Sequence, residues 1–380
     1  MNRPVILIIG TRPEAIKMLP VYFALQRMHI PTLICATNQH SELLDEGFSL
    51  FEVTPDIRLD IMQPGQDLFH ITTVILEKAK ALFNRIQPSL VVVQGDTTSS
   101  MAAALAAFYL KIPVAHVEAG LRTHDMQNPF PEEFNRSSIA LVADYHFAPT
   151  QLAQSHLLSA GIVPEKIFFT GNTVVDAFRI IRHQIEQHEI VIDENIVDIV
   201  HQCKTKSQQL VLLTVHRRES FNGGIVRILQ SIKTFAQENP DIFFFYPVHP
   251  NPYVAQAIET VGLDQISNIY RCKAVTYKHL LYILLHANWV ITDSGGIQEE
   301  ATSLSKYTLV VREKTERMEG ILAGLAELVG TDEHKITQAM KQQKNRPRAH
   351  MPTPTAIYGN GFAADAIAAI IKKTYGAHQL

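Results

Sequence analysis

Residues 5–17 read VILIIGTRPEAIK, and this stretch decides the fold class. Val5–Ile9 is a continuous apolar run of strand length, Gly10 allows a tight turn, and Pro13 suits the first turn of a helix. A strand that is apolar on both faces and leads directly into a helix is typical of a parallel sheet covered by helices on both sides. The stretch therefore predicts an α/β fold.

The same order of strand, loop and helix recurs along the chain. In the first half we expect buried strands at Thr32–Ala36, Leu90–Gln94, Val114–Val117, Tyr145–Ala148 and Ile167–Thr170, with helices near 13–27, 67–85, 98–110 and 150–160. In the second half we expect strands at Leu210–Val215, Phe243–Val248, Trp289–Thr292 and Thr308–Val311, with helices near 222–237, 251–261, 276–286 and 295–303. Two series of this kind predict two doubly wound, Rossmann-like domains facing each other across a cleft.

The predicted boundary between the two domains lies near Gly171. The first domain would span residues 1–170 and the second residues 171–360. A last helical pattern, within residues 361–380, is expected to pack back on the first domain. At 380 residues, two domains also fit the usual domain size.

Composition excludes several classes of protein. Hydrophobic residues make up 46% of the chain and charged residues 19%, which excludes a disordered polymer. The net charge of −3 argues against a general nucleic-acid or membrane-surface binder. No apolar run is long enough to span a membrane, and the N-terminus is interpreted as a first strand rather than a signal peptide. Cys35, Cys203 and Cys272 form no CxxC pair, which favours a reducing compartment, the cytoplasm.

Polar residues cluster where the predicted strands of the first domain end. Arg12 and Lys17 follow the first strand near a helix N-terminus, where they either bind phosphate or belong to an ordinary helix surface. Asp96 and Thr97 follow the strand at Leu90–Gln94, and either of them could simply cap the next helix.

Two further carboxylates follow in the same domain. Glu118 ends the next strand, where Arg122 is a possible structural partner. Glu132 lies four residues before Arg136, which by itself indicates an exposed helical ion pair. Because parallel strands end at one edge of a sheet, Asp96, Glu118 and Glu132 are expected to converge there, as acid–base catalysis requires.

The second domain offers a different set of residues. His216 ends a predicted strand in a cationic segment, and Ser294, Gly295 and Gly296 end another strand and open a helix. A Gly-Gly turn at a helix N-terminus can cradle a diphosphate, although alone it is more typical of a simple loop. Glu300 lies further along that helix, where it could accept ribose hydroxyls, and Arg312 and Arg317 follow the next strand. His249 is interpreted as structural.

Several enzyme classes lack their characteristic motifs in this chain. There is no HExxH pair, no Gly-x-Ser-x-Gly elbow, no GxGxxG and no Walker loop. The other histidines also lack metal-ligand spacing, so no metal site is expected.

Nine motifs occur in the order found in one enzyme family. They are GTRPEAIKMLPV, QGDTTSSMAAALAAFY, HVEAGLRT, PFPEEFNR, ADYHFAPT, TGNTVVDA, HRRES, YPVHPNP and TDSGGIQEEA. In these motifs the chain resembles the non-hydrolysing UDP-N-acetylglucosamine 2-epimerases from about residue 5 to the final helix. The resemblance implies two Rossmann-like domains in the glycosyltransferase-B arrangement with the active site in the interdomain cleft, and typically a homodimer. It also implies interconversion of UDP-N-acetylglucosamine and UDP-N-acetylmannosamine for bacterial surface polysaccharides.

The resemblance also assigns roles to residues. It makes Asp96, Glu118 and Glu132 the acid–base candidates, and Arg12, Lys17 and Arg136 active-site cations. It places His216, Ser294, Gly295, Gly296, Glu300 and Arg317 in the UDP-binding set, with His216 also a catalytic candidate. The family's reaction implies no metal or nicotinamide cofactor, since the redox state of C2 does not change.

The chain departs from the family pattern in two segments beside the nucleotide loop. Ser305-Lys306-Tyr307 replaces the usual Gly-Lys-Pro, and Lys314–Gly320 replaces Thr-Thr-Glu-Arg-Pro-Glu-Ala. These changes keep an epimerase for a modified UDP-sugar open as an alternative, beside a glycosyltransferase and a non-catalytic nucleotide-sugar sensor. Gln39-His40 matches part of a region that activates some members, but Glu42 stands where glutamine is expected. Strong allostery is therefore not predicted.

Overall fold

The computed structural model describes residues 3–37, 41–63, 65–217, 220–221, 223–346 and 357–377. The chain divides into two compact units. Unit 1 is Met1–Ile180 with Tyr358–Leu380, and unit 2 is Ile181–Ile357. Gln39 and His40, the pair considered for allostery, lie outside the described residues.

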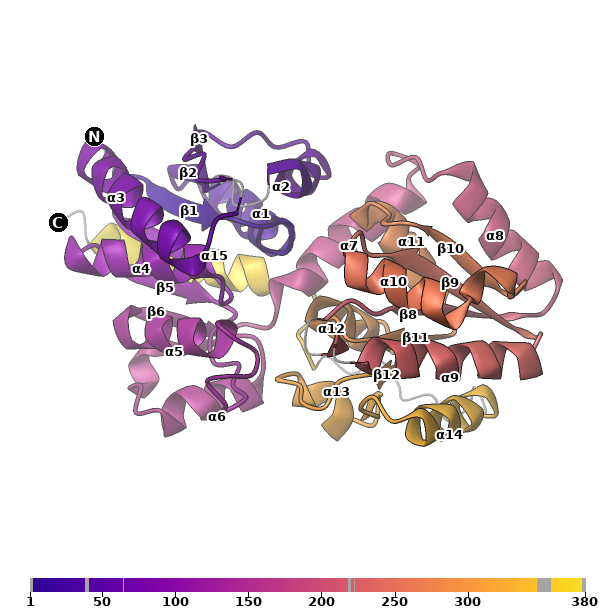
Figure 1. Cartoon of the computed structure of the whole chain (residues 1–380). Helices are drawn as coiled ribbons and strands as arrows, with labels where there is room; N and C mark the ends of the chain where they lie inside the picture. The colour runs from indigo at the N-terminus through magenta and orange to yellow at the C-terminus, as the bar shows by residue number, and fades with distance from the viewer. Residues whose placement is uncertain are drawn as a thin grey trace. The chain divides into compact units, whose positions relative to one another are not determined.

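The described part of unit 1 contains a parallel seven-stranded sheet in the order β3-β2-β1-β4-β5-β6-β7 (Figure 1). Ile6 and Ile8 of β1 pack with residues of α3 and α4 on one face. Helices α1 and α15 contact each other on the other face. The strands are β1 (Val5–Ile9), β2 (Thr32–Ala36), β3 (Ile57–Arg58), β4 (Leu90–Gln94), β5 (Val114–Val117), β6 (Tyr145–Ala148) and β7 (Ile167–Phe169). The helices are α1 (Arg12–Arg27), α2 (Ser41–Ser49), α3 (Leu68–Ile86), α4 (Thr98–Tyr109), α5 (Glu132–Val142), α6 (Gln151–Ser159) and α15 (Ala363–Ala377), and α7 (Thr173–Glu186) begins in this unit and ends in unit 2.

The described part of unit 2 contains a parallel six-stranded sheet in the order β10-β9-β8-β11-β12-β13. Helices α9, α10 and α14 pack over one face, and the main core of the unit lies beneath them (Figure 1). The strands are β8 (Gln209–Thr214), β9 (Ile242–Val248), β10 (Ile269–Lys273), β11 (Trp289–Thr292), β12 (Tyr307–Val310) and β13 (Ala326–Leu328). The helices are α8 (Glu194–Thr205), α9 (Gly224–Glu238), α10 (Pro252–Val261), α11 (Tyr277–His286), α12 (Gly295–Ser303), α13 (Met318–Leu322) and α14 (Glu333–Lys344).

Both sheets confirm the predicted doubly wound α/β class. In each, the chain builds outward from its first strand in one direction and then returns to build on the other side. The order therefore reverses between β1 and β4 in unit 1, and between β8 and β11 in unit 2. Ligands of such sheets bind at the carboxyl ends of the strands that flank this switch point.

The strands that the sequence pattern missed lie at sheet edges. β3, β10 and β13 are all edge strands, and all of them were unpredicted. They are short or half-exposed, so they lack the continuous apolar run that marks a strand buried on both faces. The central strands begin and end within one residue of their predicted positions.

Unit 1 extends past the predicted boundary near Gly171 and ends after Ile180. The reason is that the start of α7 is bonded to the returning C-terminal segment. The Asn172 amide donates to the Tyr358 carbonyl over 2.7 Å. The Asp176 carboxylate accepts the amides of Ala363 and Ala364 at the start of α15, over 3.2 and 2.9 Å.

This buried carboxylate makes stability depend on pH. Burial raises the pKa of Asp176 to about 6, from an ordinary value of 3.8. The folded chain therefore holds this proton more tightly than the unfolded chain, so its stabilising contribution is present below about pH 4 and is lost as pH rises through 6. The test compares the free energy of unfolding of wild type with that of Asp176→Asn. We expect the difference, wild type minus variant, to decrease by roughly 1–3 kcal/mol from pH 4 to pH 7.

Urea unfolding followed by circular dichroism at several pH values measures this difference. Because asparagine does not titrate, the comparison isolates Asp176 from the other acids. A difference that stays constant between pH 4 and 7 would contradict the assignment.

Candidate active site

In unit 1 the loops after β1 and β4 flank the switch point. The side chain of Glu14 forms hydrogen bonds with residues of both loops. Its carboxylate is buried and accepts the amides of Gly10 and Thr11 over 2.6 and 2.7 Å. It also accepts the hydroxyls of Thr97 and Ser100 over 2.6 and 2.8 Å. Burial raises the pKa of Glu14. Sequence reasoning missed this residue, although Thr11 followed by Glu14 matches a capping box.

Glu118 follows β5 and is held by two buried side chains. Its Oε2 accepts the Lys17 ammonium and the Gln94 amide, each over 2.5 Å. Its backbone has a φ of 65°, a left-handed conformation that costs a non-glycine residue roughly 1–3 kcal/mol. Arg122, the partner that the sequence suggested, instead donates to the Leu121 carbonyl over 2.7 Å.

Asp96 follows β4 and pairs with Arg136 of α5. Thr97 caps α4 by accepting the Ser100 amide, so Asp96 is not the cap. The Arg136 guanidinium contacts the Asp96 carboxylate over 2.5 Å and lies 3.6 Å from Glu133. The alternative interpretation, an exposed ion pair between Glu132 and Arg136, is therefore excluded: Arg136 is buried beside Asp96 and Glu133.

Three polar atoms in this cluster are buried without a hydrogen-bond partner among the described residues. They are Oε2 of Glu132 and the Nε and Nη1 atoms of Arg136. Such atoms are costly to bury, and a ligand that bonds to them would recover that cost. A carboxylate oxygen and two guanidinium nitrogens without hydrogen-bond partners suit a ligand that offers both hydrogen-bond donors and negative charge, although Nη1 also lies 3.6 Å from Glu133.

The predicted residues of unit 1 lie along one edge of one sheet. β4 and β5 are neighbours in register, with Gln94 opposite Val117, so Asp96 and Glu118 leave the sheet side by side. Glu132 begins α5, one helical turn before Arg136, which binds Asp96. Arg12 begins α1 and pairs with Glu46 over 3.0 Å.

Glu133 is a second residue that sequence reasoning missed. Its buried carboxylate accepts the backbone amides of Thr123 and His124 over 3.0 and 3.1 Å. It thereby fixes the loop before α5 and also faces Arg136. Only the i, i+3 spacing to Arg136 could have indicated this role.

In unit 2 the loops after β8 and β11 flank the switch point. Asp293, in the loop after β11, forms hydrogen bonds with the loop after β8. This fully buried carboxylate accepts the amides of His216 and Arg217 over 2.6 and 2.7 Å. Its other oxygen lies 3.3 Å from Nδ1 of His216. Burial lowers the pKa of His216, while Asp293 acts against that shift. The His216 ring also stacks on His249, with centroids 4.9 Å apart. Asp293 was quoted in a motif but was not predicted as a site residue.

Ser294, Gly295 and Gly296 lead into α12 from the same edge. Ser294 precedes the helix without making a side-chain capping bond. A Cβ atom at Gly295 would lie 2.6 Å from the Arg317 guanidinium carbon, so glycine is needed for Arg317 to approach. A Cβ at Gly296 would meet nothing within 4 Å. The backbone beside Gly296 is therefore accessible to a ligand.

Arg317 and Glu300 are both held by neighbours within unit 2. Arg317 donates from Nε to Glu299 over 3.1 Å and also contacts Glu316. The buried Glu300 accepts the Tyr277 hydroxyl over 2.8 Å. His216, Ser294–Gly296 and Arg317, which the sequence predicted for unit 2, thus follow the carboxyl ends of β8, β11 and β12, respectively.

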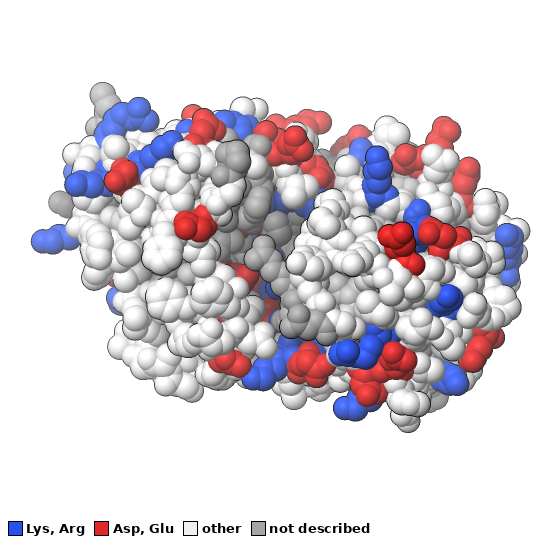
Figure 2. Space-filling model, in the orientation of Figure 1, with Lys and Arg blue, Asp and Glu red and all other residues white. Residues whose placement is uncertain are grey.

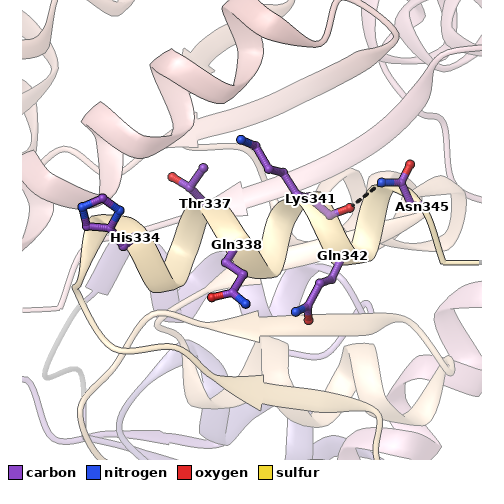
Figure 3. Close-up of a pocket in the computed structure, with 6 residues that line it drawn as sticks. All are labelled: His334, Thr337, Gln338, Lys341, Gln342 and Asn345. Atoms are coloured by element: carbon purple, nitrogen blue, oxygen red, sulfur yellow. Dashed lines mark hydrogen bonds between the residues drawn. The ribbon is translucent and has the colours of Figure 1, made fainter.

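Two hollows in unit 2 differ in character. One, of about 530 Å³, runs along α14, where the side chains shown in Figure 3 come from that helix and its C-cap, Asn345, and do not converge. The other, of about 810 Å³, lies at the carboxyl ends of β9 and β10 and includes His249, the residue that stacks on His216. Only the second adjoins the candidate site.

The described residues contain no group of three or more His, Cys, Asp or Glu side chains arranged to hold a metal ion. Within the same residues, no helix is both long and apolar enough to cross a membrane.

Comparison with known proteins identifies the family. A family model described as UDP-N-acetylglucosamine 2-epimerase matches residues 24–372. The chain belongs to this epimerase family. It is 41% identical to the UDP-N-acetylglucosamine 2-epimerase of Salmonella typhimurium over 97% of this chain and 98% of that relative. The crystal structure of the Neisseria meningitidis UDP-GlcNAc 2-epimerase bound to UDP-GlcNAc superposes with a TM-score of 0.90 and 39% identity, covering 97% of this chain and 100% of that one. The crystal structure of the Methanocaldococcus jannaschii UDP-GlcNAc 2-epimerase in complex with UDP-GlcNAc and UDP superposes with a TM-score of 0.83 and 32% identity. It covers 97% of this chain and 99% of that one.

In this member of the epimerase family, the two segments that depart from the family pattern beside α12 are bonded to neighbouring helices through residues that keep the pattern, Lys306 and Thr315. Lys306 donates to the carbonyls of Leu285 and Ala287 over 2.9 and 2.7 Å, at the end of α11. Thr315 donates to Gln298 of α12 over 2.9 Å. These bonds connect the two segments to the end of α11 and to α12, the helix that carries Glu300.

Proposed function

We propose that this chain interconverts UDP-N-acetylglucosamine and UDP-N-acetylmannosamine at sugar C2, in the synthesis of bacterial surface polysaccharides. One observation carries the proposal. Two acids at the switch-point edge of unit 1, Glu118 and Asp96, are each paired with a buried cation, and Glu132 beside them has a buried carboxylate oxygen without a hydrogen-bond partner among the described residues. This arrangement provides bases and acids near a ligand that carries negative charge.

The chemistry of the substrate explains why several acids are needed. The hydrogen at C2 is not acidic, because that carbon bears no carbonyl. It becomes removable when the bond between C1 and the UDP oxygen breaks. A carboxylate takes the proton, the C–H electrons form the C1=C2 double bond of 2-acetamidoglucal, and the C1–O electrons leave with UDP. Return of UDP to C1 and delivery of the proton to the other face of C2 complete the inversion.

We assign Asp96, Glu118 and Glu132 to these proton transfers, and Arg12, Lys17 and Arg136 to the charge that develops on the diphosphate. The Nε atom of Arg136, which is buried and has no hydrogen-bond partner among the described residues, supports this assignment. The proposal includes no metal and no nicotinamide cofactor, since C2 begins and ends in the same oxidation state.

We assign the nucleotide to unit 2. The free backbone amides at the start of α12 and the helix dipole favour a diphosphate beside Ser294, Gly295 and Gly296. His216 and Arg317 add positive or donor groups, and the Glu300 carboxylate is suited to ribose hydroxyls.

Gly296→Ala is expected to weaken UDP binding about 10- to 100-fold, because the added methyl group would occupy the space assigned to the diphosphate. The free energy of unfolding is expected to change by less than about 1 kcal/mol, since that methyl group meets no protein atom within 4 Å. Titration calorimetry with UDP measures the affinity. Ser303→Ala, at the other end of α12, is the matched control. Unchanged UDP affinity in Gly296→Ala would contradict the placement of the diphosphate.

Incubation with UDP-N-acetylglucosamine in D2O tests the activity itself. We expect deuterium at C2 of both epimers, observed by NMR. Folded protein that binds UDP but exchanges no C2 hydrogen would favour a nucleotide-sugar sensor. Transfer of the sugar to an acceptor without exchange would favour a glycosyltransferase.

The second candidate is the same reaction on a modified UDP-sugar, such as a 2,3-diacetamido derivative. The departures at Ser305–Tyr307 and Lys314–Gly320 motivate it, because they flank the nucleotide loop. Comparing the kcat/KM values for the two substrates decides between them.

We also propose that the chain forms a homodimer in the cytoplasm. In Figure 2 the side of unit 1 over α4 carries few charges. Phe69 of α3 and Phe108 and Tyr109 of α4 are exposed, as is common at interfaces between subunits. The free thiols of Cys35, Cys203 and Cys272 fit a reducing compartment. Sedimentation equilibrium is expected to give twice the 42.6 kDa of one chain, and a monomeric mass would contradict the dimer.

A further inference from the structure

The turn that carries Asp96 is bonded on all sides to buried groups that the proposed mechanism does not use. The Gly95 amide donates to the Val117 carbonyl over 3.0 Å. The Gly95 carbonyl contacts Nε2 of His116 over 2.7 Å, and the Asp96 carbonyl accepts the Asn135 side-chain amide over 2.9 Å. Gly95 has a φ of 69°, which glycine adopts without strain. Both carbonyls of the turn are thus held by side-chain donors.

His116 can act here only as a donor. A carbonyl oxygen accepts, so Nε2 must carry the hydrogen and Nδ1 the lone pair. The side chain is buried in β5, and its Nδ1 has no hydrogen-bond partner among the described residues. Burial lowers the pKa of His116 to about 3, so the ring stays neutral at physiological pH. A neutral imidazole that is already committed to a carbonyl does not transfer protons to a substrate.

Asn135 holds the turn from the opposite element. It lies on α5 between Glu132 and Arg136 and is also buried. Its amide reaches the Thr98 hydroxyl over 3.3 Å as well as the Asp96 carbonyl. α5 therefore contacts Asp96 twice, through Asn135 at the backbone and through Arg136 at the carboxylate.

We propose that His116 and Asn135 are positioning residues that fix the Gly95–Asp96 peptide, so that the Asp96 carboxylate has one orientation toward Arg136 and the substrate. This inference rests on the proposed function. Neither residue acts on the substrate itself, so both influence the reaction only through Asp96. A misplacement of about 1 Å can cost a rate factor of about 100, so the loss of one of these bonds should be visible in kcat.

His116→Phe removes the donor and nearly keeps the ring volume. We expect kcat for epimerisation to fall about 10- to 100-fold, with KM within about threefold of wild type. His116→Gln, which can still offer an N–H, should recover much of that loss. The pH profile of kcat should keep its shape, because His116 does not itself titrate in the reaction.

His146 provides a matched control. It is the register partner of His116 on β6, is equally buried, and hydrogen-bonds the backbone of Ala143 instead of the Asp96 turn. His146→Phe should therefore lose a similar amount of stability while keeping kcat within about threefold of wild type. If His146→Phe lowers kcat as much as His116→Phe, general damage to the sheet explains the loss and the proposal is overturned.

Non-additivity gives the sharpest test. In an Asp96→Asn background, adding His116→Phe or Asn135→Leu should not reduce the residual rate of C2 deuterium exchange any further. The reason is that both residues act through the Asp96 carboxylate, which this background lacks. A full additional loss in that background would overturn the proposal. So would wild-type kcat in folded Asn135→Leu, the variant that also serves if His116→Phe does not fold. If wild type itself exchanges no deuterium, it is the proposed function that fails.

Discussion

Glu118→Gln is expected to lower kcat for epimerisation about 10³-fold, within the usual range for loss of a general acid or base. The substitution keeps the shape of the side chain, and its carbonyl oxygen can still accept Lys17 and Gln94. The charge is lost, however, and an amide cannot take a proton from carbon. Epimer formation and C2 deuterium incorporation, both followed by NMR, measure the effect.

The same variant should still bind UDP within about threefold of wild type, because its amide oxygen can still accept the Lys17 ammonium and the groups assigned to UDP in unit 2 are unchanged. Asp144→Asn is the matched control. Asp144 precedes β6 at the opposite, amino-terminal edge of the same sheet, where it pairs with Lys166 over 3.2 Å. Its substitution should leave kcat unchanged. Near-normal kcat in Glu118→Gln would remove this residue from the proposed chemistry.

Arg136→Met is expected to reduce both activity and stability. The buried guanidinium pairs with the carboxylates of both Asp96 and Glu133, and its removal leaves both without this cation. Breaking a buried ion pair in this way costs about 3–5 kcal/mol. We expect the free energy of unfolding to fall by about 3 kcal/mol, since Asp96 is partly exposed, and kcat to fall at least about 100-fold.

Urea unfolding followed by circular dichroism measures the loss of stability. The single tryptophan, Trp289, is buried in β11 of unit 2, so its fluorescence reports on the unfolding of unit 2. The urea midpoint measured by this fluorescence should change less than the midpoint measured by circular dichroism. Arg136→Lys keeps the charge but not the planar fork, and should give intermediate values for both quantities. An unfolding free energy equal to that of wild type would show that Asp96 and Glu133 do not depend on this cation.

The central part of the fold could be predicted because its signals are local. β1, β2, β4, β5 and β6 are buried on both faces, so each appears as a short apolar run between helical patterns. The edge strands β3, β10 and β13 are stabilised by one neighbour and carry no such run. Their positions depend on the strand beside them, and a single sequence does not show which strand that is.

The candidate site divides in a similar way. The motifs and their order indicated Asp96, Glu118, Glu132 and the family reaction, and the family comparison confirmed that membership. The individual roles of those acids stay predictions. Glu14, Glu133 and Asp293 were missed, because each bonds mainly to backbone amides or hydroxyls of loops, and an acid that organises a loop looks the same in sequence as an acid on the surface.

The sequence by itself determined the α/β class, the two-part organisation and the chemical character of the residues at the strand ends. Each of these follows from local patterns, the short-range periodicity and the order of the motifs. Only the tertiary structure decided which charge pairs with which. Lys17 meets Glu118 across 101 positions of sequence, and Arg136 meets Asp96 instead of Glu132 one turn away. The physical reason is that partners in a buried ion pair are chosen by which strands lie side by side and which side chains share the interior.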